Sequence, residues 1–329
     1  MGNILRSVWP LLRQLVPLKR RCKYCIISEA YTPLIGGLCP DCLTQNSKFA
    51  SKTDSIAPKG AQERLDALIR AHLSDAPYHA LLMLSGGKDS AYILDRLRQE
   101  YPNLRLLCVT VNNGFMSPIA IKGAQHCAEK SHTDIIITNA CINRFKHALK
   151  NAFLSLNGQG SYGVIDYTDG SLIFEVGKDI AKQLNIPLLI GGLTWVQTQI
   201  IIGQDDFELK KQNDPTIIFP LAVWRPNEQE IRAYVREKEL LPPGADDPLV
   251  SNSRLIMTMC ALDVMNLGYC SFEPEFAQLI REGKTDRTTW LYNFEMLEHA
   301  VRSGQMTKEV EKTLTELDLT LAQVKGVQK

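Results

Sequence analysis

The stretch from Leu81 to Leu97, LLMLSGGKDSAYILDRL, constrains the fold of this chain more than any other part of the sequence. Its apolar beginning predicts a short buried strand, and the pattern after the glycines predicts an amphipathic helix. A glycine-rich turn at such a junction lets backbone N–H groups and the positive end of a helix dipole face one point. Because that arrangement binds anions, the stretch predicts an α/β fold with an anion-binding loop.

The side chains of the loop narrow the type of anion. Ser85 and Ser90 offer hydroxyl donors and Lys88 offers a positive charge, which suits phosphate. Asp89 alone would repel phosphate, and its presence is explained if it holds a Mg²⁺ ion that bridges to phosphate oxygens. The loop therefore predicts a cradle for a magnesium-bound di- or triphosphate, with an ordinary Gly-Gly turn and serine cap as the alternative. It is not a Walker A loop, because Asp follows Gly-Lys where that motif has Ser or Thr.

Apolar segments alternate with segments of helical periodicity through the middle of the chain. Strands are predicted at 79–85, 104–113, 133–140 and 186–193. Helices are predicted at 63–73, 88–101, 117–131, 142–156 and 172–185. Because the strands are nearly continuous apolar runs, they favour a parallel sheet that helices cover on both faces. Ligands of such sheets bind beyond the carboxyl ends of the strands, where the loop lies.

Two C-x-x-C pairs near the N-terminus predict a zinc ribbon. Each pair is a tight knuckle, and the segment between the pairs contains Gly36 and Gly37, which suits a hairpin that brings them together. Four thiolates complete a tetrahedral Zn²⁺ site without an open position, so its work is structural. An iron–sulfur cluster or a redox pair is the alternative. The ligands are Cys22, Cys25, Cys39 and Cys42.

Composition favours a globular protein of the cytoplasm. The chain has 45% apolar residues, 22% charged residues and a net charge of +1, so no global field attracts nucleic acid. Its cysteines are odd in number, at nine, which suits a reducing compartment better than a disulfide framework. No apolar run is long enough to predict a transmembrane helix.

The first twenty residues predict a helix. Ile4, Val8, Leu11 and Leu15 share one of its faces, and arginines interrupt any signal-peptide pattern. We expect this face to pack on the protein itself or on a partner. Peripheral attachment to a membrane surface is the alternative.

The motif S-G-G-K-D-S resembles the PP-loop of the N-type ATP pyrophosphatases. The resemblance implies that ATP is cleaved between its α- and β-phosphates and that a substrate carbonyl oxygen is adenylated, after which nitrogen or sulfur displaces AMP. It implies catalytic roles for Lys88 and Asp89, and an adenosine site at the ends of the second and fourth strands. The implied pyrophosphate and magnesium ligands are Ser85, Gly86, Gly87, Lys88, Asp89 and Ser90, and the implied adenosine residues include Val111, Asn112, Gly191 and Gly192.

The nucleophile is not fixed by this motif. Sulfur-inserting relatives carry a C-x-x-C before the helix that leads into the fourth strand, where this chain has Asp166-Tyr167-Thr168-Asp169. Carboxylates do not carry persulfide sulfur, but they bind Mg²⁺, an amine or a sugar hydroxyl. Two solvated loop aspartates are the alternative. Cys141 follows the third strand and is the best candidate for a reactive thiol, against a packing role.

The spacing C-x-x-C…P-L-I…G-L-C-x-x-C before the PP-loop resembles the N-acetyl sugar amidotransferases of lipopolysaccharide and O-antigen biosynthesis. Softer similarity continues to about residue 295, through stretches such as DDPLVSN. The resemblance implies an ATP-dependent amidotransferase that converts an acetamido group on a sugar nucleotide, with ammonia from a separate glutaminase subunit. The alternatives are a sulfurtransferase supplied by a cysteine desulfurase, and a zinc-ribbon nucleic-acid adaptor with an inactive loop.

These expectations divide the chain into an N-terminal helix, a zinc ribbon, a PP-loop ATP pyrophosphatase domain and a helical C-terminal region. Their boundaries are 1–20, 21–50, 60–222 and 223–329. In the last region, 307–326 predicts one amphipathic helix. Trp195, Asn252 and Arg254 are further candidates for contact with substrate or phosphate.

Overall fold

The computed structural model describes residues 2–45, 59–139, 142–199, 203, 206–245 and 252–326. The chain forms two compact units. The sheet unit comprises Thr53–Phe145 and Gly170–Ser253. The cysteine unit comprises Met1–Lys52, Lys146–Asp169 and Arg254–Lys329, so it is assembled from both ends of the chain.

The described strands of the sheet unit form one sheet in the order β3-β2-β1-β4-β6-β5. All neighbouring pairs are parallel except β5 and β6. This confirms the predicted parallel sheet, although the last two strands were not predicted. The bounds are β1 Ala80–Met83, β2 Leu106–Val111, β3 Asp134–Thr138, β4 Leu188–Ile190, β5 Glu208–Leu209 and β6 Thr216–Ile218.

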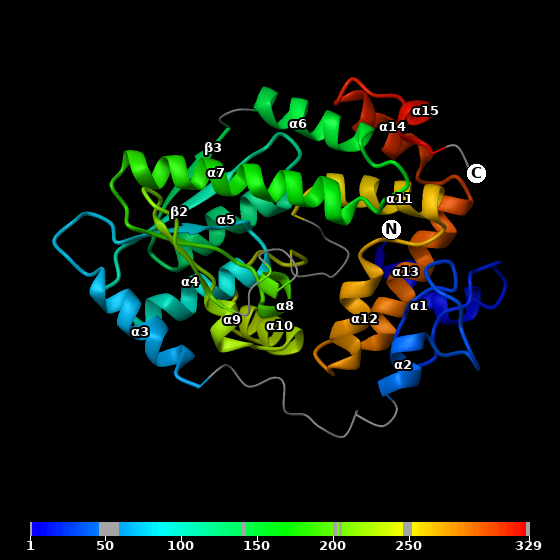
Figure 1. Cartoon of the computed structure of the whole chain (residues 1–329), viewed down its shortest axis with the longest axis horizontal. Coiled ribbons are helices and arrows are strands. Elements are labelled where there is room, and N and C mark those ends of the chain that lie inside the picture. Colours follow the sequence, from blue (N-terminus) through cyan, green and yellow to red (C-terminus); the bar gives the residue numbers. More distant parts are fainter. Residues whose placement is uncertain are drawn as a thin grey trace. The chain divides into compact units, whose positions relative to one another are not determined.

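Helices cover both faces of this sheet. Alternate strand residues point to opposite sides and so contact different helices. Leu82 and Leu84 join a core cluster that includes Ile93 of α4. On the other side, Gly177 of α7 lies against Met83 and Leu189. Figure 1 shows these helices around the strands. Their bounds are α3 Ala61–Ala71, α4 Lys88–Glu100, α5 Pro118–Lys130, α7 Tyr167–Gln183, α8 Trp195–Gln197, α9 Pro220–Trp224 and α10 Glu228–Glu237.

The order of the strands decides what lies beside the loop after β1. β1 pairs with β2 on one side and with β4 on the other, and all three run in the same direction. Their carboxyl ends therefore share one edge of the sheet. The segments that follow Met83, Val111 and Ile190 are brought together by this topology.

The cysteine unit contains mainly helices, together with the cysteine module at residues 21–45, which ends in the short helix α2. α13 packs against α1, α11 and α12. Its helices are α1 Gly2–Leu12, α2 Pro40–Gln45, most of α6 Ile142–Leu154, the π-helix η2 Tyr162–Asp166, α11 Leu255–Leu267, α12 Glu273–Arg281, α13 Arg287–Arg302, α14 Thr307–Thr315 and α15 Leu321–Val324. The prediction of one helix over 307–326 is wrong. Asp318 adopts a left-handed φ of 52°, which ends α14, and Thr320 begins α15 with a capping box.

The N-terminal helix packs on its own protein, but not through the predicted face. Trp9 is buried and donates its Nε1–H to Glu295 of α13 at 3.1 Å. Leu11 and Leu15 of the predicted face are instead 73% and 81% exposed. One buried aromatic ring with a polar partner thus outweighs several leucines in setting the orientation of this helix. Among the described residues, no helix combines the length and the apolar character needed to cross a membrane.

Candidate functional site

The predicted phosphate loop joins β1 to α4. Its first carbonyl, that of Leu84, accepts a hydrogen bond from the buried Thr110 hydroxyl of β2 at 2.6 Å. Gly87 is the N-cap residue of α4 and supplies no capping side chain. The N–H groups in the first turn of α4 are therefore available to an anion.

Gly86 has no room for a side chain. Its φ is +75°, a left-handed value, and a Cβ built there would lie 1.8 Å from the carbonyl oxygen of Ala120 in α5. A Cβ on Gly123, one turn further along α5, would lie 2.6 Å from the carbonyl oxygen of Gly86. The loop and the first turns of α5 are thus in direct backbone contact, which fixes the loop peptides relative to β1 and β2.

The two charged side chains of the loop pair with each other. Lys88 Nζ lies 2.7 Å from Asp89 Oδ2, and the side chains are 21% and 35% exposed. This exposure leaves both groups within reach of a ligand. Phosphate binding by the lysine and Mg²⁺ binding by the carboxylate stay predictions.

The predicted adenosine residues follow β2 and β4, the neighbours of β1. Asn112 donates from Nδ2 to Asn139 Oδ1 at 2.7 Å and accepts from the Gly114 N–H at 3.0 Å. Gly191 is required for packing, because a Cβ there would lie 2.7 Å from the rings of Phe174 and Phe219. Val111 and Gly192 lie next to these residues in the chain, and adenosine binding by this group stays a prediction.

Asp166 and Asp169 do not lie in a solvated loop, so that alternative is wrong. Asp166 ends the π-helix η2, and Asp169 is a buried residue in the first turn of α7. Burial, and after it the negative charges of Asp169 and Glu275, raises the pKa of Asp166 to about 7. A carboxyl group with this pKa exchanges a proton readily near neutral pH, which suits general acid–base work.

The four cysteines of the two C-x-x-C pairs meet as predicted. The sulfur atoms of Cys22, Cys25, Cys39 and Cys42 all lie within 4.8 Å of one another and are buried. Cys25 Sγ and Cys39 Sγ are 3.7 Å apart, close to the separation of about 3.8 Å that Zn–S bonds of 2.3 Å give in a tetrahedron. Hydrogen bonds from Cys25 and from backbone N–H groups lower the pKa of Cys22. The donor set therefore fits a tetrahedral metal ion.

Arginine side chains hold the backbone of the first cysteine pair. Arg287, in the first turn of α13, donates from Nε to the carbonyl of Cys25 at 2.9 Å and from Nη2 to that of Cys22 at 3.0 Å. Arg21 donates from Nη1 to the carbonyl of Ile26 at 3.1 Å. Both cations thus satisfy carbonyls that the tight turn leaves without partners.

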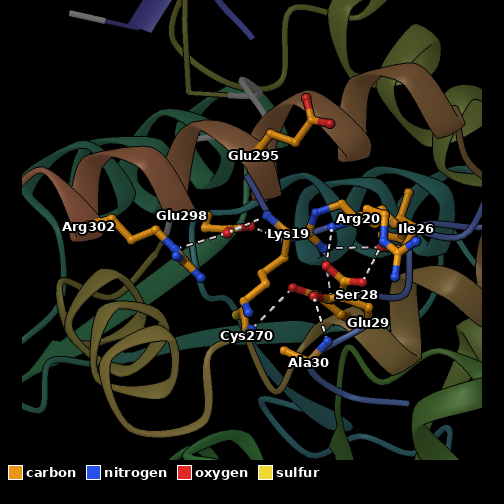
Figure 2. A network of polar contacts seen from close by, with 12 residues as sticks. Lys19, Arg20, Ile26, Ser28, Glu29, Ala30, Cys270, Glu295, Glu298 and Arg302 are labelled. Atoms are coloured by element: carbon orange, nitrogen blue, oxygen red, sulfur yellow. Dashed lines mark hydrogen bonds and ion pairs between the residues drawn. The ribbon is translucent and has the colours of Figure 1, made fainter. Parts of the chain in front are cut away.

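Arg21 also belongs to a buried ion network. Its Nη1 lies 2.8 Å from Glu273 of α12 and its Nη2 lies 3.2 Å from Glu298 of α13, with all three side chains at most 3% exposed. Glu273 accepts the N–H of Ser28 and of Cys270. Glu298 accepts the backbone N–H of Lys19 and forms an ion pair with Arg302 (Figure 2). The network joins the cysteine module to α12 and α13. No sequence pattern indicates this network, because its charged residues lie far apart in the chain and are ordinary one by one.

Three further cysteines and Arg254 were also considered for functional or packing roles. Cys141 is outside the described residues, so its candidate role stays a prediction. Cys108 and Cys127 are buried in β2 and α5, in agreement with packing roles. Arg254 forms a two-pronged ion pair with Glu316 at 2.9 and 3.0 Å, which occupies the group considered for phosphate contact.

Comparisons with known proteins give partial matches. No protein-family model matches the chain. An uncharacterised protein of Methanocaldococcus jannaschii is 29% identical over 123 residues, which cover 36% of this chain and 42% of that protein. The chain therefore matches less than half of the length of this relative.

Three solved structures are similar to the chain at low identity. The U34-tRNA thiolase NcsA from Methanococcus maripaludis with its 4Fe-4S cluster is 15% identical, with a TM-score of 0.39 and 89% of each chain covered. NMN synthetase from Francisella tularensis is 13% identical, with a TM-score of 0.43 and 78% and 96% covered. NAD+ synthetase from Burkholderia pseudomallei is 16% identical, with a TM-score of 0.41 and 79% and 93% covered. Similarities at scores this low carry no argument about the function of this chain.

The contact at Gly86 makes a sharp mutational prediction. We expect Gly86→Ala to lower the free energy of unfolding by roughly 2–5 kcal/mol, because a Cβ adds both backbone strain and overlap with Ala120. Gly60→Ala is the matched control, since Gly60 also has a left-handed φ of +81° but has open space around its Cβ position. It should cost about 1 kcal/mol. Urea unfolding measures the free energy of unfolding of both variants. Equal decreases would show that the loop is not held by α5.

The raised pKa of Asp166 predicts a pH-dependent stability. The folded chain holds a proton on Asp166 that the unfolded chain releases above its ordinary pKa of 3.8, so this group lowers stability as pH rises from about 4 to about 7. Asp166→Asn removes the ionisable group. We expect the free energy of unfolding of this variant, relative to that of wild type, to increase by roughly 1–3 kcal/mol as the pH rises from 4 to 8. Thermal unfolding across this pH range provides the measurement.

Asp318→Asn is the control for this experiment, because its side chain is 89% exposed and asparagine tolerates its left-handed φ. It should follow the wild-type pH profile. If the difference in stability between wild type and Asp166→Asn does not change over this pH range, the raised pKa of Asp166 is contradicted.

The cysteine cluster predicts one bound metal ion per chain. We expect Cys39→Ser to lose this metal and to lower the free energy of unfolding by more than about 3 kcal/mol, because the module lacks a core of its own. Cys127→Ser, which changes a buried thiol of α5, should keep the metal. Elemental analysis and thermal unfolding provide the measurements. Purified protein without metal, at unchanged stability, would refute the assignment.

Proposed function

We propose that the protein is an ATP-dependent enzyme that cleaves ATP to AMP and pyrophosphate and adenylates a carbonyl oxygen of its substrate. The loop after β1 supports this most strongly. It combines an uncapped helix N-terminus, a backbone fixed against α5, and paired Lys88 and Asp89 side chains at the edge of a parallel sheet. An anion held there is surrounded by fixed N–H donors, which need no reorganisation during the reaction.

Each part of the loop has a role in this proposal. The N–H groups from Gly86 to Ser90 and the hydroxyl of Ser85 bind the two phosphates that leave as pyrophosphate. Ser90 orients the loop through its hydrogen bonds with the Ser85 N–H and the Gly87 carbonyl. Lys88 neutralises charge that develops on the leaving group. Asp89 holds Mg²⁺, which supplies further charge neutralisation at the phosphate oxygens. The segments after β2 and β4 bind adenosine.

We propose nitrogen as the nucleophile, so the enzyme is an amidotransferase. Asp166 and Asp169 stand in the sequence where a sulfur-carrying thiol pair would be needed. With a pKa of about 7, Asp166 is suited to exchange a proton near neutral pH. The proposed acceptor is an acetamido group on a sugar nucleotide, and a glutaminase subunit supplies the ammonia.

The thiols support the sulfur alternative less well. Outside the four-cysteine cluster, the described cysteines are all buried. Burial raises the pKa of Cys127 to about 12, and it also raises the pKa of Cys108 and Cys270. Buried thiols of this kind are poor nucleophiles and poor carriers of persulfide sulfur. A sulfurtransferase would therefore depend on Cys141.

Two further assignments belong to this proposal. Zinc is the metal of the cysteine cluster, because four thiolates in a closed tetrahedron are typical of structural zinc sites. The exposed Leu11 and Leu15 provide apolar area for peripheral attachment of a cytoplasmic enzyme to a membrane surface.

The products of ATP cleavage test the proposed function. We expect AMP and pyrophosphate when the protein is incubated with ATP, Mg²⁺, ammonium and N-acetylated sugar nucleotides. Lys88→Ala and Asp89→Asn should each reduce AMP formation at least about 100-fold, because each removes charge stabilisation of the leaving group. Lys238→Ala, at an exposed lysine of the same unit, should leave the rate unchanged. Phosphorus NMR identifies the products, and ADP with phosphate would exclude this chemistry.

A further inference from the structure

A residue far along the chain lies directly on the phosphate loop. Asn252 donates from Nδ2 to Ser85 Oγ at 3.1 Å, across 167 positions of sequence. A Cβ built on Gly87 would lie 2.6 Å from the same Nδ2 atom, so the amide also lies beside Gly87. Asn252, Ser85 and Gly87 all belong to the sheet unit.

The backbone holds Asn252 in this place. Its carbonyl accepts the N–H of Ser117 at 2.9 Å, and Ser253 forms an antiparallel bridge with Met116. Ser117 is the N-cap residue of α5, the helix whose next turns pack against Gly86. The contact between Asn252 and Ser85 is therefore anchored to the same element that fixes the loop.

The hydrogen bonds around Ser85 have a defined direction. Ser85 Oγ accepts from Asn252 Nδ2 and, at 3.4 Å, from the Gly87 N–H. Ser90 Oγ accepts the N–H of Ser85 at 3.2 Å and donates its own proton to the Gly87 carbonyl at 3.2 Å. Both lone pairs of Ser85 Oγ are thus used, and its proton is left as a donor, either to Ser90 Oγ at 3.1 Å or to an anion.

We propose that Asn252 is a positioning residue of the phosphate loop, whose amide fixes the Ser85 hydroxyl as a proton donor to the pyrophosphate portion of ATP. This inference rests on the proposed function and adds a residue to it. An amide is required because it donates to Ser85 Oγ without adding charge. A carboxylate at this position would instead accept the Ser85 proton and would repel the phosphates.

Calorimetric titration of the full chain with ATP, pyrophosphate and AMP, each with Mg²⁺, tests the proposal. We expect Asn252→Ala to weaken ATP and pyrophosphate binding about three- to tenfold, the usual effect of one neutral hydrogen bond. We expect Asn252→Asp to weaken both roughly 100-fold, through lost donation and added repulsion. AMP binding should stay unchanged in both variants, because AMP lacks the two phosphates at the loop.

Asn213→Asp is the matched control, since it places the same charge at an exposed position of the same unit and should bind all three ligands as wild type does. Equal weakening of AMP and ATP in the Asn252 variants would indicate a general structural role and overturn the proposal. Wild-type affinity of Asn252→Asp for ATP would overturn it as well. Failure of the wild-type protein to bind ATP or pyrophosphate would instead refute the proposed function itself.

Discussion

The backbone contact between Gly86 and the first turns of α5 is the constraint on which the proposed phosphate loop depends. Neither Gly86 nor Gly123 has room for a Cβ. A Cβ on Gly86 would overlap the carbonyl oxygen of Ala120, and a Cβ on Gly123 would overlap the carbonyl oxygen of Gly86. α5 follows β2, and the loop follows β1. The contact therefore fixes the position of the loop relative to the ends of both neighbouring strands. A loop whose N–H groups are fixed before the ligand arrives binds phosphate without a cost of ordering.

The two units are stabilised in different ways. The sheet unit buries β1 on both faces and has a continuous apolar cluster. The cysteine module relies instead on four convergent thiols and on Arg21, Glu273 and Glu298, which are buried as a hydrogen-bonded ion network. Buried charges of this kind add little net stability compared with apolar packing, but removing one partner is costly. The network therefore specifies how the module joins α12 and α13.

Much of the sheet unit could be predicted because local signals agree with tertiary structure there. The strand, glycine turn and helix from Ala80 to Glu100 follow apolar periodicity, and the cysteine cluster follows from the spacing of its pairs. β5 and β6 were missed because two- and three-residue strands have no periodicity to detect. α7 begins at Tyr167 rather than near residue 172, since the π-helix Tyr162–Asp166 leads directly into it. Asn252 was named as a candidate, but its contact with Ser85 spans too much sequence for any local pattern to indicate.

A crystal structure with the uncleavable analogue α,β-methylene-ATP and Mg²⁺ tests the central claim most directly. The proposed enzyme should hold the β- and γ-phosphates against the N–H groups from Gly86 to Ser90, with adenosine at the segments that follow β2 and β4. An analogue bound with its adenosine at the loop, or bound away from the loop altogether, would contradict the assignment of Ser85 to Ser90 as the pyrophosphate site.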